Sequence, residues 1–389
     1  MNIYSSEVLR PCTSCQMCGA VCNKNAISIK LNKDGFYRPV LDDNKCVNCG
    51  LCKQVCYKFD KCLYNTSDEE LKEIPLYAAS AKDKFLVSQA TSGGIADIMA
   101  KELIKLGYKV IGVEYDFSTD KAISRVASLE NETDSFRGSK YIQPYTFDAF
   151  KILVSECRDQ KFAVFGLPCH IYAVNRYLSK FNLRNNCILI DLYCHGCPSM
   201  NVWIKVKDKI KQKIGSTDFD SVNFRSKAKG WGQFILEAKS GRRKYHSTPL
   251  KNEFYNLFFS NQVLNESCED CHLRSTLAYT DIRLGDFWGK AFKHNRKGVS
   301  GVSLASNAGQ DLFNKVLPYI ISKRMNHSDF IPYQSWGHRY KINQNLRDSL
   351  LNSLSNDSKV EKTILILNKR LSTKQKAKRV LKTIYYYFI

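Results

Sequence analysis

Apolar residues recur along the chain with two different spacings. Over residues 95–106 they fall three to four positions apart, directly after a Thr-Ser-Gly-Gly turn at residues 91–94, which predicts an amphipathic helix. Short and nearly continuous apolar runs, typical of buried strands, occupy residues 108–115, 161–166 and 187–192. This alternation of helix and strand predicts an α/β (α+β) region.

The N-terminal segment follows a different pattern, in which cysteines recur in two copies of C-x2-C-x2-C-x3-C. Each cysteine of the second copy lies 34 residues after its counterpart, and the full set is Cys12, Cys15, Cys18, Cys22, Cys46, Cys49, Cys52 and Cys56. Between the copies, residues 26–31 and 36–41 flank an Asp-Gly pair, which predicts a β-hairpin.

This cysteine spacing indicates iron–sulfur clusters. Three thiolates at i, i+3 and i+6 on a tight loop can bind three iron corners of a cubane, while the fourth cysteine, at the start of a helix, reaches the other cubane. We therefore assign one [4Fe-4S] cluster to Cys12, Cys15, Cys18 and Cys56, and the other to Cys46, Cys49, Cys52 and Cys22. Zinc is the alternative, but a zinc site pairs two short C-x2-C knuckles and does not need the third cysteine.

Residues 10–58 also resemble the bacterial two-cluster ferredoxins. The cysteine repeat and the hairpin between its copies carry this resemblance. Asn23 and Tyr57 stand where the ferredoxin pattern usually has proline, which concerns the cluster environment because proline is not a ligand.

Two later segments could contact a phosphate. The turn made by Thr91, Ser92, Gly93 and Gly94 offers backbone N–H groups at the positive end of a predicted helix. The alternative is that Thr91 or Ser92 only caps that helix. Around a Gly138-Ser139 turn, Arg137 and Lys140 place two cations that could neutralise a cofactor phosphate or could belong to a solvated loop.

Six motifs follow one another in the order of a single family. They are Thr91-Ser-Gly-Gly94, Arg137-Gly-Ser-Lys-Tyr141, Gly166-Leu-Pro-Cys-His170, Asp191-Leu-Tyr-Cys-His-Gly196, Cys268-x2-Cys271 and Asp281-Ile-Arg-Leu-Gly-Asp-Phe-Trp288. In this series the chain resembles the beta-subunit family of the deazaflavin-coenzyme (F-420) hydrogenases and dehydrogenases, with a fused ferredoxin head. The resemblance implies bound FAD, a third [4Fe-4S] cluster, and electron transfer through the flavin to a two-electron acceptor.

By the same resemblance, the ligands of the third cluster are Cys169, Cys194, Cys268 and Cys271. Cys197 lies three residues after Cys194 and is the alternative fourth ligand. Together, Cys194, Cys197, Cys268 and Cys271 also have the spacing of a zinc knuckle, which is the competing interpretation.

For FAD, the resemblance and the turn chemistry both favour Thr91, Ser92, Gly93 and Gly94, with Arg137, Gly138, Ser139 and Lys140 as the second contact. A cation near the flavin N1–C2 carbonyl would stabilise the reduced flavin, and Lys140 is the first candidate for that catalytic role. His170 and His195 adjoin proposed ligand cysteines. Each could donate a proton or could hydrogen-bond a cluster sulfur.

The resemblance also divides the chain. We expect a two-cluster ferredoxin domain over residues 1–62 and a polar linker over 63–75. A flavin-binding domain is then expected over 76–160, and a C-terminal family domain with the third cluster over 161–335. Residues 336–389 are expected to form a basic helical tail.

Composition and the lack of targeting patterns indicate the cellular compartment. The chain has 389 residues, 16 cysteines, and 59 Lys and Arg against 37 Asp and Glu, for a formal net charge of +22. It starts without a signal-peptide pattern and has no apolar run long enough to span a membrane, so we expect a cytoplasmic protein. So many cysteines in a reducing compartment favour metal binding over disulfides.

Residues 359–389 are strongly basic and carry four consecutive aromatic residues just before the last residue, Ile389. One interpretation is an amphipathic helix in peripheral contact with the inner membrane surface, and the other is a terminal helix packed on the core. The positive charge also suits an acidic electron donor such as ferredoxin or flavodoxin. We do not expect nucleic-acid binding, because the sequence has no recognition motif for it.

These features predict an iron–sulfur flavoprotein oxidoreductase that passes electrons from a low-potential donor through [4Fe-4S] clusters to FAD and on to a small-molecule acceptor. Some proteins that resemble this arrangement accompany cell-surface polysaccharide synthesis, and by analogy this chain could have a role there. The alternative is an electron-transfer subunit that feeds a partner oxidoreductase, and a weaker one is a redox-sensing protein without turnover.

Overall fold

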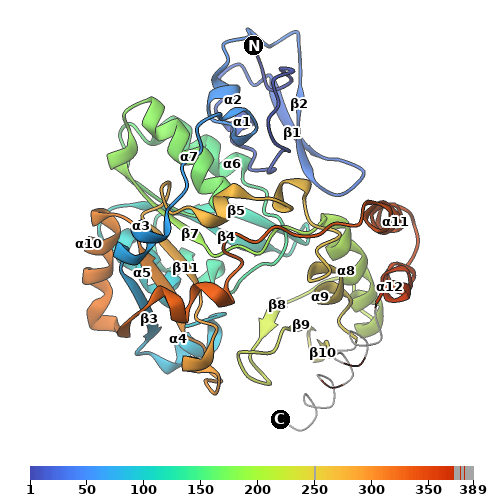
Figure 1. Cartoon of the computed structure of the whole chain (residues 1–389). Helices are drawn as coiled ribbons and strands as arrows, with labels where there is room; N and C mark the ends of the chain where they lie inside the picture. The colour runs from blue at the N-terminus through green and yellow to red at the C-terminus, as the bar shows by residue number, and fades with distance from the viewer. Residues whose placement is uncertain (249–250, 372–376, 378–380, 382–389) are drawn as a thin grey trace.

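The computed structural model describes residues 1–248 and 251–371, together with Ala377 and Leu381. Figure 1 shows three parts: a small N-terminal head, a large sheet with helices on its faces, and a helical unit beside a smaller sheet. The large sheet has eight strands, the smaller sheet three, and the head a two-stranded hairpin.

The head is built around its hairpin and two short helices. Its elements are α1 (Met17–Ala20), β1 (Ile27–Leu31), β2 (Tyr37–Leu41) and α2 (Leu51–Gln54). The predicted hairpin is confirmed, since β1 and β2 pair antiparallel with Ile27 opposite Leu41. Gly35 of the Asp-Gly pair has a φ of +79°, a left-handed conformation that glycine adopts without steric cost.

The large sheet has the strand order β13-β3-β12-β11-β7-β6-β4-β5. Its strands are β3 (Leu76–Ala81), β4 (Lys109–Asp116), β5 (Lys121–Ala127), β6 (Phe162–Phe165), β7 (Cys187–Leu192), β11 (Ile282–Asp286), β12 (Ser300–Leu304) and β13 (Ile320–Met325). The central strands β4, β6, β7 and β11 run parallel, whereas β5, β12 and β13 pair antiparallel with their neighbours. The predicted α/β (α+β) class is confirmed.

Helices cover both faces of this sheet because successive strand residues point to opposite sides. The helices are α4 (Lys84–Gln89), α5 (Ile95–Lys105), α6 (Phe147–Glu156), α7 (Pro168–Lys180) and α10 (Asn307–Val316). Met99 of α5 and Phe313 of α10 share one core with strand residue Ile190. Phe150 of α6 and Val174 of α7 share the core on the other face with Leu189.

The structure bears on the expected domain division at position 160 and on the expected linker over residues 63–75. Strands on either side of position 160 belong to one sheet, because β4 pairs with β6 along Val110 and Ala163. Residues 76–160 and 161–335 therefore both contribute strands to this sheet. The segment expected as a linker contains helix α3 (Asp68–Glu73), which begins with a capping box between Ser67 and Glu70.

The third part surrounds an antiparallel sheet of order β10-β9-β8. Its elements are α8 (Met200–Ile214), β8 (Ser221–Ser226), β9 (Ile235–Ser240), β10 (Arg243–His246), α9 (Glu253–Phe258), α11 (Gln344–Ser355) and α12 (Val360–Lys369). Trp203 of α8, Phe224 of β8 and Phe254 of α9 form its buried centre.

The start of the tail packs on this core. Val360 and Leu367 of α12 are buried in it, and Lys209 of α8 forms an ion pair with Glu361 at 2.7 Å. Residues 372–376, 378–380 and 382–389, on which the membrane interpretation depends, lie outside the described residues. Across the described chain, none of the helices combines the length and apolar character that a bilayer crossing requires.

Candidate iron–sulfur site

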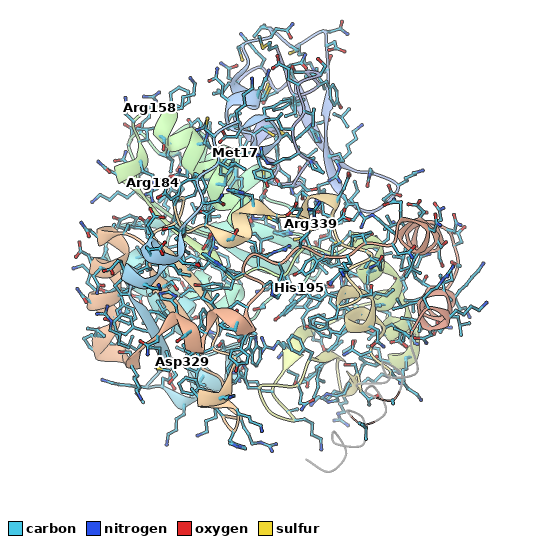
Figure 2. The ribbon with its side chains drawn as sticks, in the orientation of Figure 1. Met17, Arg158, Arg184, His195, Asp329 and Arg339 are labelled. Atoms are coloured by element: carbon cyan, nitrogen blue, oxygen red, sulfur yellow. The ribbon has the colours of Figure 1, made fainter. Side chains whose placement is uncertain are left out.

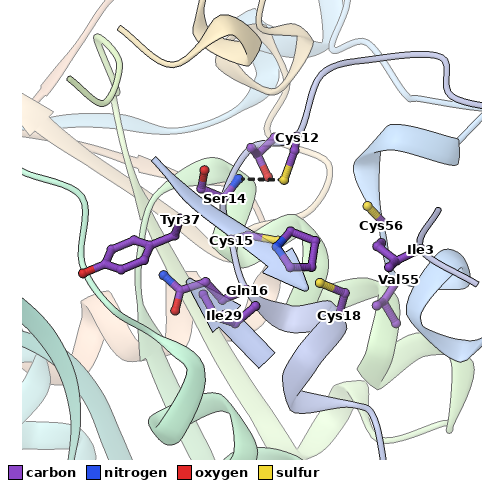
Figure 3. A pocket seen from close by; sticks show the side chains of 12 residues that line it. Ile3, Cys12, Ser14, Cys15, Gln16, Cys18, Ile29, Tyr37, Val55 and Cys56 are labelled. Carbon is purple, nitrogen blue, oxygen red and sulfur yellow. Dashed lines mark hydrogen bonds between the residues drawn. The ribbon is translucent and has the colours of Figure 1, made fainter. Parts of the chain in front are cut away.

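Four head cysteines from the two copies of the repeat line one pocket. Cys12, Cys15 and Cys18 come from the first loop and α1, and Cys56 follows α2 (Figure 3). Ile3, Ile29 and Val55 complete an apolar lining. Burial raises the pKa of Cys15 to about 11. Four sulfur donors, two of them buried and two partly buried, in apolar surroundings have the donor chemistry of a [4Fe-4S] cluster.

A second pocket is lined by Cys22 together with Cys46, Cys49 and Cys52. Burial raises the pKa of Cys52, and the neighbouring Cys49 and Cys22 raise it further. The two pockets thus divide the cysteines in the crossed way that the spacing predicts. This second pocket is the outer one, because Cys49 is exposed whereas Cys15 and Cys18 are buried.

The backbone repeats along with the sequence. Ser14 and Gln16 in the first loop have φ values of 61° and 66°, and their counterparts Asn48 and Gly50 have 54° and 79°. These left-handed residues turn each loop around its pocket. In the first loop the Ser14 N–H points at the Cys12 sulfur at 3.4 Å, drawn as the dashed line in Figure 3. Such N–H donors lower the charge density on a ligand sulfur.

Hydrogen bonds fix the first loop to the body of the protein. The Gln16 side chain accepts from the backbone N–H of Thr146 at 2.9 Å and donates to the Pro144 carbonyl at 2.9 Å. Thr146 Oγ1 donates to the Cys15 carbonyl at 2.9 Å, and Gln143 Nε2 donates to the Ser14 carbonyl at 3.3 Å. The side chains of Gln16, Gln143 and Thr146 are buried, so the head is held in one place against α6.

A third group of cysteines, which we call the third cysteine group, consists of Cys169, Cys194, Cys197, Cys268 and Cys271. Cys169 lies in the first turn of α7 directly after β6, and Cys194 and Cys197 follow β7. Parallel strands deliver both segments to the same edge of the sheet. Cys268 ends a short 3-10 turn (Glu266–Cys268), and its sulfur accepts from the Cys197 N–H at 3.4 Å.

The third cysteine group lies next to the inner head pocket. Burial raises the pKa of Cys169 well above its usual range, and the nearby Cys197 and Cys15 raise it further. Cys15 belongs to a core against which Cys169 and Cys271 pack. The structure therefore brings together a loop of the head and residues more than 150 positions later.

Five cysteines meet where the family resemblance implies four ligands. Burial raises the pKa of Cys197 well above its usual range, and Cys268, Cys194 and Cys271 raise it further. Both Cys194 and Cys197 are thus close to Cys268 and Cys271. Nowhere in the described ranges do three His, Cys, Asp or Glu side chains come together as ligands for a single metal ion.

We predict that Cys194→Ala lowers the iron content by about four atoms per chain, whereas Cys197→Ala does not. Cys194 is the ligand that the family pattern implies, and Cys197 would remain a buried apolar neighbour. Iron and sulfide analysis of the two anaerobically purified variants measures this difference. The reverse result would transfer the ligand role to Cys197, and iron loss in neither variant would contradict the assignment of this cluster.

The two histidines proposed as proton donors lie in different surroundings. His170 is buried in α7, its Nε2 atom has no partner among the described residues, and burial lowers its pKa to about 4. Burial likewise lowers the pKa of His195 to about 4. Both ring nitrogens of His195 have partners, Asn261 Oδ1 at 2.7 Å and the Tyr340 hydroxyl at 3.1 Å. Figure 2 shows His195 in the middle of the molecule.

The structure joins the two segments proposed to contact FAD. The Ser139 N–H donates to Thr91 Oγ1 at 2.6 Å, so the turns at residues 91–94 and 137–140 are neighbours. Part of the polar surface is already used, because Ser92 Oγ donates to the Val299 carbonyl at 2.9 Å. The Gly93 N–H donates to Ser300 Oγ at 3.0 Å. Neither Thr91 nor Ser92 forms a side-chain cap on α5, whose N-cap residue is Gly94.

Gly93 is required by a close approach to the large sheet. A Cβ atom at this position would lie 2.4 Å from the Ala79 carbonyl oxygen and 3.0 Å from the Ser300 nitrogen. We therefore predict that Gly93→Ala lowers the free energy of unfolding by about 1–3 kcal/mol, as measured by urea denaturation. Gly232→Ala is the matched control, because a Cβ there would have no atom within 4 Å. Equal stability of both variants would contradict the close approach.

The two cations of the second turn are engaged differently. Arg137 forms ion pairs with Asp97 at 2.9 Å and with Asp134, so its charge is largely compensated. Lys140 donates to the carbonyls of Ser135, Phe136 and Arg137 at 2.9 to 3.1 Å, and burial lowers its pKa to about 7. Of the two, Lys140 has no ion-pair partner among the described residues, and its lowered pKa weakens its charge near neutral pH.

Two arginines beside the third cysteine group have no role that the sequence alone predicts. Arg274 and Arg283 are both buried, and each opposes the rise in the pKa of Cys194 that burial causes. Arg283 lies within the last of the six family motifs, and Arg274 lies three residues after Cys271. The only sequence signal for these two arginines is their closeness to the proposed ligands and to the family motif. Their burial, which is rare for arginine without a partner, is visible only in the structure.

Two family models match the chain. Residues 159–323 match the C-terminal part of the beta subunit of coenzyme F420 hydrogenase/dehydrogenase. Residues 11–58 match the 4Fe-4S dicluster domain. Among solved structures, the chain is similar to a chain of the F420-reducing [NiFe] hydrogenase complex from Methanosarcina barkeri, in a xenon derivative. The sequence identity is 15%, the TM-score is 0.48, and 80% of this chain and 92% of that chain are covered. No curated protein matches the sequence.

Proposed function

The chain joins a 4Fe-4S dicluster domain to the C-terminal domain of the coenzyme F420 hydrogenase/dehydrogenase beta-subunit family, and on this basis we propose that it is an oxidoreductase with three [4Fe-4S] clusters in series. The observation that carries the proposal is the packing of Cys169 and Cys271 against the core that contains Cys15. It makes the inner head pocket the neighbour of the third cysteine group, so electrons could pass between them inside one polypeptide.

Each cluster would be held by four cysteines. Cys12, Cys15, Cys18 and Cys56 would hold the inner head cluster, and Cys22, Cys46, Cys49 and Cys52 the outer one. Cys169, Cys194, Cys268 and Cys271 would hold the third. When bound, such clusters accept and release single electrons.

Electrons would enter at the outer head pocket. Cys49 is exposed there, and the neighbouring Val47 is 60% exposed, which gives a donor protein an apolar contact next to a ligand. The chain carries a net charge of +22. An acidic donor such as a ferredoxin or a flavodoxin would therefore be steered toward it at low salt.

FAD would bind where the two turns meet. The Ser139 N–H donates to Thr91 Oγ1, which holds the two turns together. Lys140 would supply the positive charge. FAD, when bound, couples one-electron donors to a two-electron acceptor. The acceptor would be a small molecule, for which analogy with proteins of cell-surface polysaccharide synthesis suggests a sugar-linked or a pyruvyl-type substrate.

Anaerobic purification followed by iron, sulfide and flavin analysis tests the proposal. We expect about twelve iron atoms and one FAD per chain. Eight iron atoms would contradict the third cluster, and twelve iron atoms without flavin would contradict only the FAD site.

The alternative is an electron-transfer subunit without its own substrate. A partner oxidoreductase that copurifies in equal amounts would favour it. Steady turnover by the isolated protein, with reduced ferredoxin and one acceptor, would contradict it.

A further inference from the structure

A buried arginine lies between the three loops that surround the third cysteine group. Arg274 is 4% exposed. Its guanidinium donates to the Cys268 carbonyl at 2.5 Å, to the His195 carbonyl at 3.2 Å and to the His338 carbonyl. It also lies over the Tyr340 ring, with its Cζ atom 4.5 Å from the ring centroid.

The partners of this guanidinium, three backbone carbonyls and an aromatic ring, are electrically neutral. In the described part of the chain, no acidic side chain forms an ion pair with Arg274. Its neighbour Arg283 differs, because two of its nitrogens bind the two oxygens of Asp191 at 2.7 and 2.5 Å. The positive charge of Arg283 is therefore compensated, and that of Arg274 is not.

The charge of Arg274 acts on several of the proposed ligands. Its guanidinium donates to the carbonyl of Cys268 itself and to that of His195, the residue after Cys194, and Arg274 lies three residues after Cys271. A fixed positive charge so close to these residues favours negative charge on their sulfurs. The same field acts on any negative charge held by these sulfurs.

We propose that Arg274 sets the reduction potential of the third cluster, by stabilising its reduced form with an uncompensated buried charge. The inference rests on the proposed function, because it requires that cluster to be present. With both clusters bound, one electron would pass from the inner head cluster to the third, and no bond would form or break. The added negative charge would be stabilised by the fixed cation of Arg274. Arg274 would thereby direct electrons from the head into the body.

An anaerobic redox titration of the full chain, followed by electron paramagnetic resonance, tests the role of Arg274. In Arg274→Gln, we expect the equilibrium constant for reducing the third cluster to fall at least tenfold, which is about 59 mV for a one-electron couple. The equilibrium constants for reducing the two head clusters should change less than threefold. Arg274→Lys keeps the charge and should stay within threefold of the wild type.

Arg339→Gln is the matched control, because Arg339 lies in the same region but its side chain is 79% exposed and pairs with Asp270 (Figure 2). It should leave all potentials unchanged. An unchanged potential in Arg274→Gln would overturn the inference, as would an equal fall in Arg274→Lys, which would assign the effect to hydrogen bonding. Loss of the third cluster from Arg274→Gln would also overturn it, in favour of a purely structural role. If the proposed function itself were wrong, the result would be different, because the wild-type protein would hold only about eight iron atoms and would show no third cluster.

Discussion

Replacing Cys12 and Cys56 together with alanine should remove about four iron atoms per chain, whereas replacing Cys12 and Cys22 together should remove up to about eight. Cys12 and Cys56 line the same pocket, so the first pair damages one cluster. Cys22 lines the other pocket with Cys46, Cys49 and Cys52, so the second pair damages both head clusters. Iron and sulfide analysis of the two anaerobically purified double variants measures the difference.

The two double variants control for each other, because each lacks two cysteines of the head. If every cluster were instead bound within one copy of the repeat, Cys12 and Cys22 would share a cluster, and the order of the two results would be reversed. Retention of the third cluster in both variants, seen as residual iron, would show that the body is folded. Equal iron loss from both variants would contradict the crossed arrangement.

Arg283→Met should lower the free energy of unfolding by about 3–5 kcal/mol. Arg283 and Asp191 each have a side chain only 2% exposed, and they form a two-fold hydrogen-bonded ion pair between β11 and β7. Without the guanidinium, the Asp191 carboxylate would be buried with no compensating charge. Arg283 also donates to the carbonyls of Leu273 and Arg274 at 3.3 and 3.2 Å, and these bonds would be lost as well.

The double variant Arg283→Met, Asp191→Leu should recover most of the stability, because replacing both charges removes the unpaired carboxylate. Arg125→Met is the surface control. Its pair with Glu114 is 53% and 25% exposed, so we expect a loss of about 0–1 kcal/mol. Urea denaturation of all three proteins under anaerobic conditions gives the comparison. A loss below about 1 kcal/mol in Arg283→Met would contradict the importance of the buried pair.

Local patterns predicted the local elements of this fold. The apolar spacing of residues 95–106 corresponds to α5 (Ile95–Lys105), and the run at 187–192 corresponds to β7. The runs on either side of the Asp-Gly pair predicted the hairpin, and the cysteine repeat predicted the crossed grouping around two pockets. In each case the residues that determine the structure lie within one element or one repeat.

What the sequence could not provide depends on contacts between distant residues. Nothing local indicates that β4 pairs with β6, since the two strands are separated by more than forty residues. The antiparallel sheet β10-β9-β8 is not predicted, since its strands are short and mixed in polarity. The surroundings of Arg274 are hidden for the same reason, because its partners come from segments around residues 195, 268 and 338.

The hydrogen bonds of Gln16, Gln143 and Thr146 have a consequence for the kinetics of the protein. A carrier domain on a flexible tether must leave one partner before it can meet the next, and diffusion then limits its turnover. The ferredoxin head of this chain has its inner loop tied into the buried surface of the body, so it cannot work as such a carrier. Electron flow from head to body would therefore be governed by fixed separations and driving forces, and solvent viscosity should slow only the encounter with the external donor.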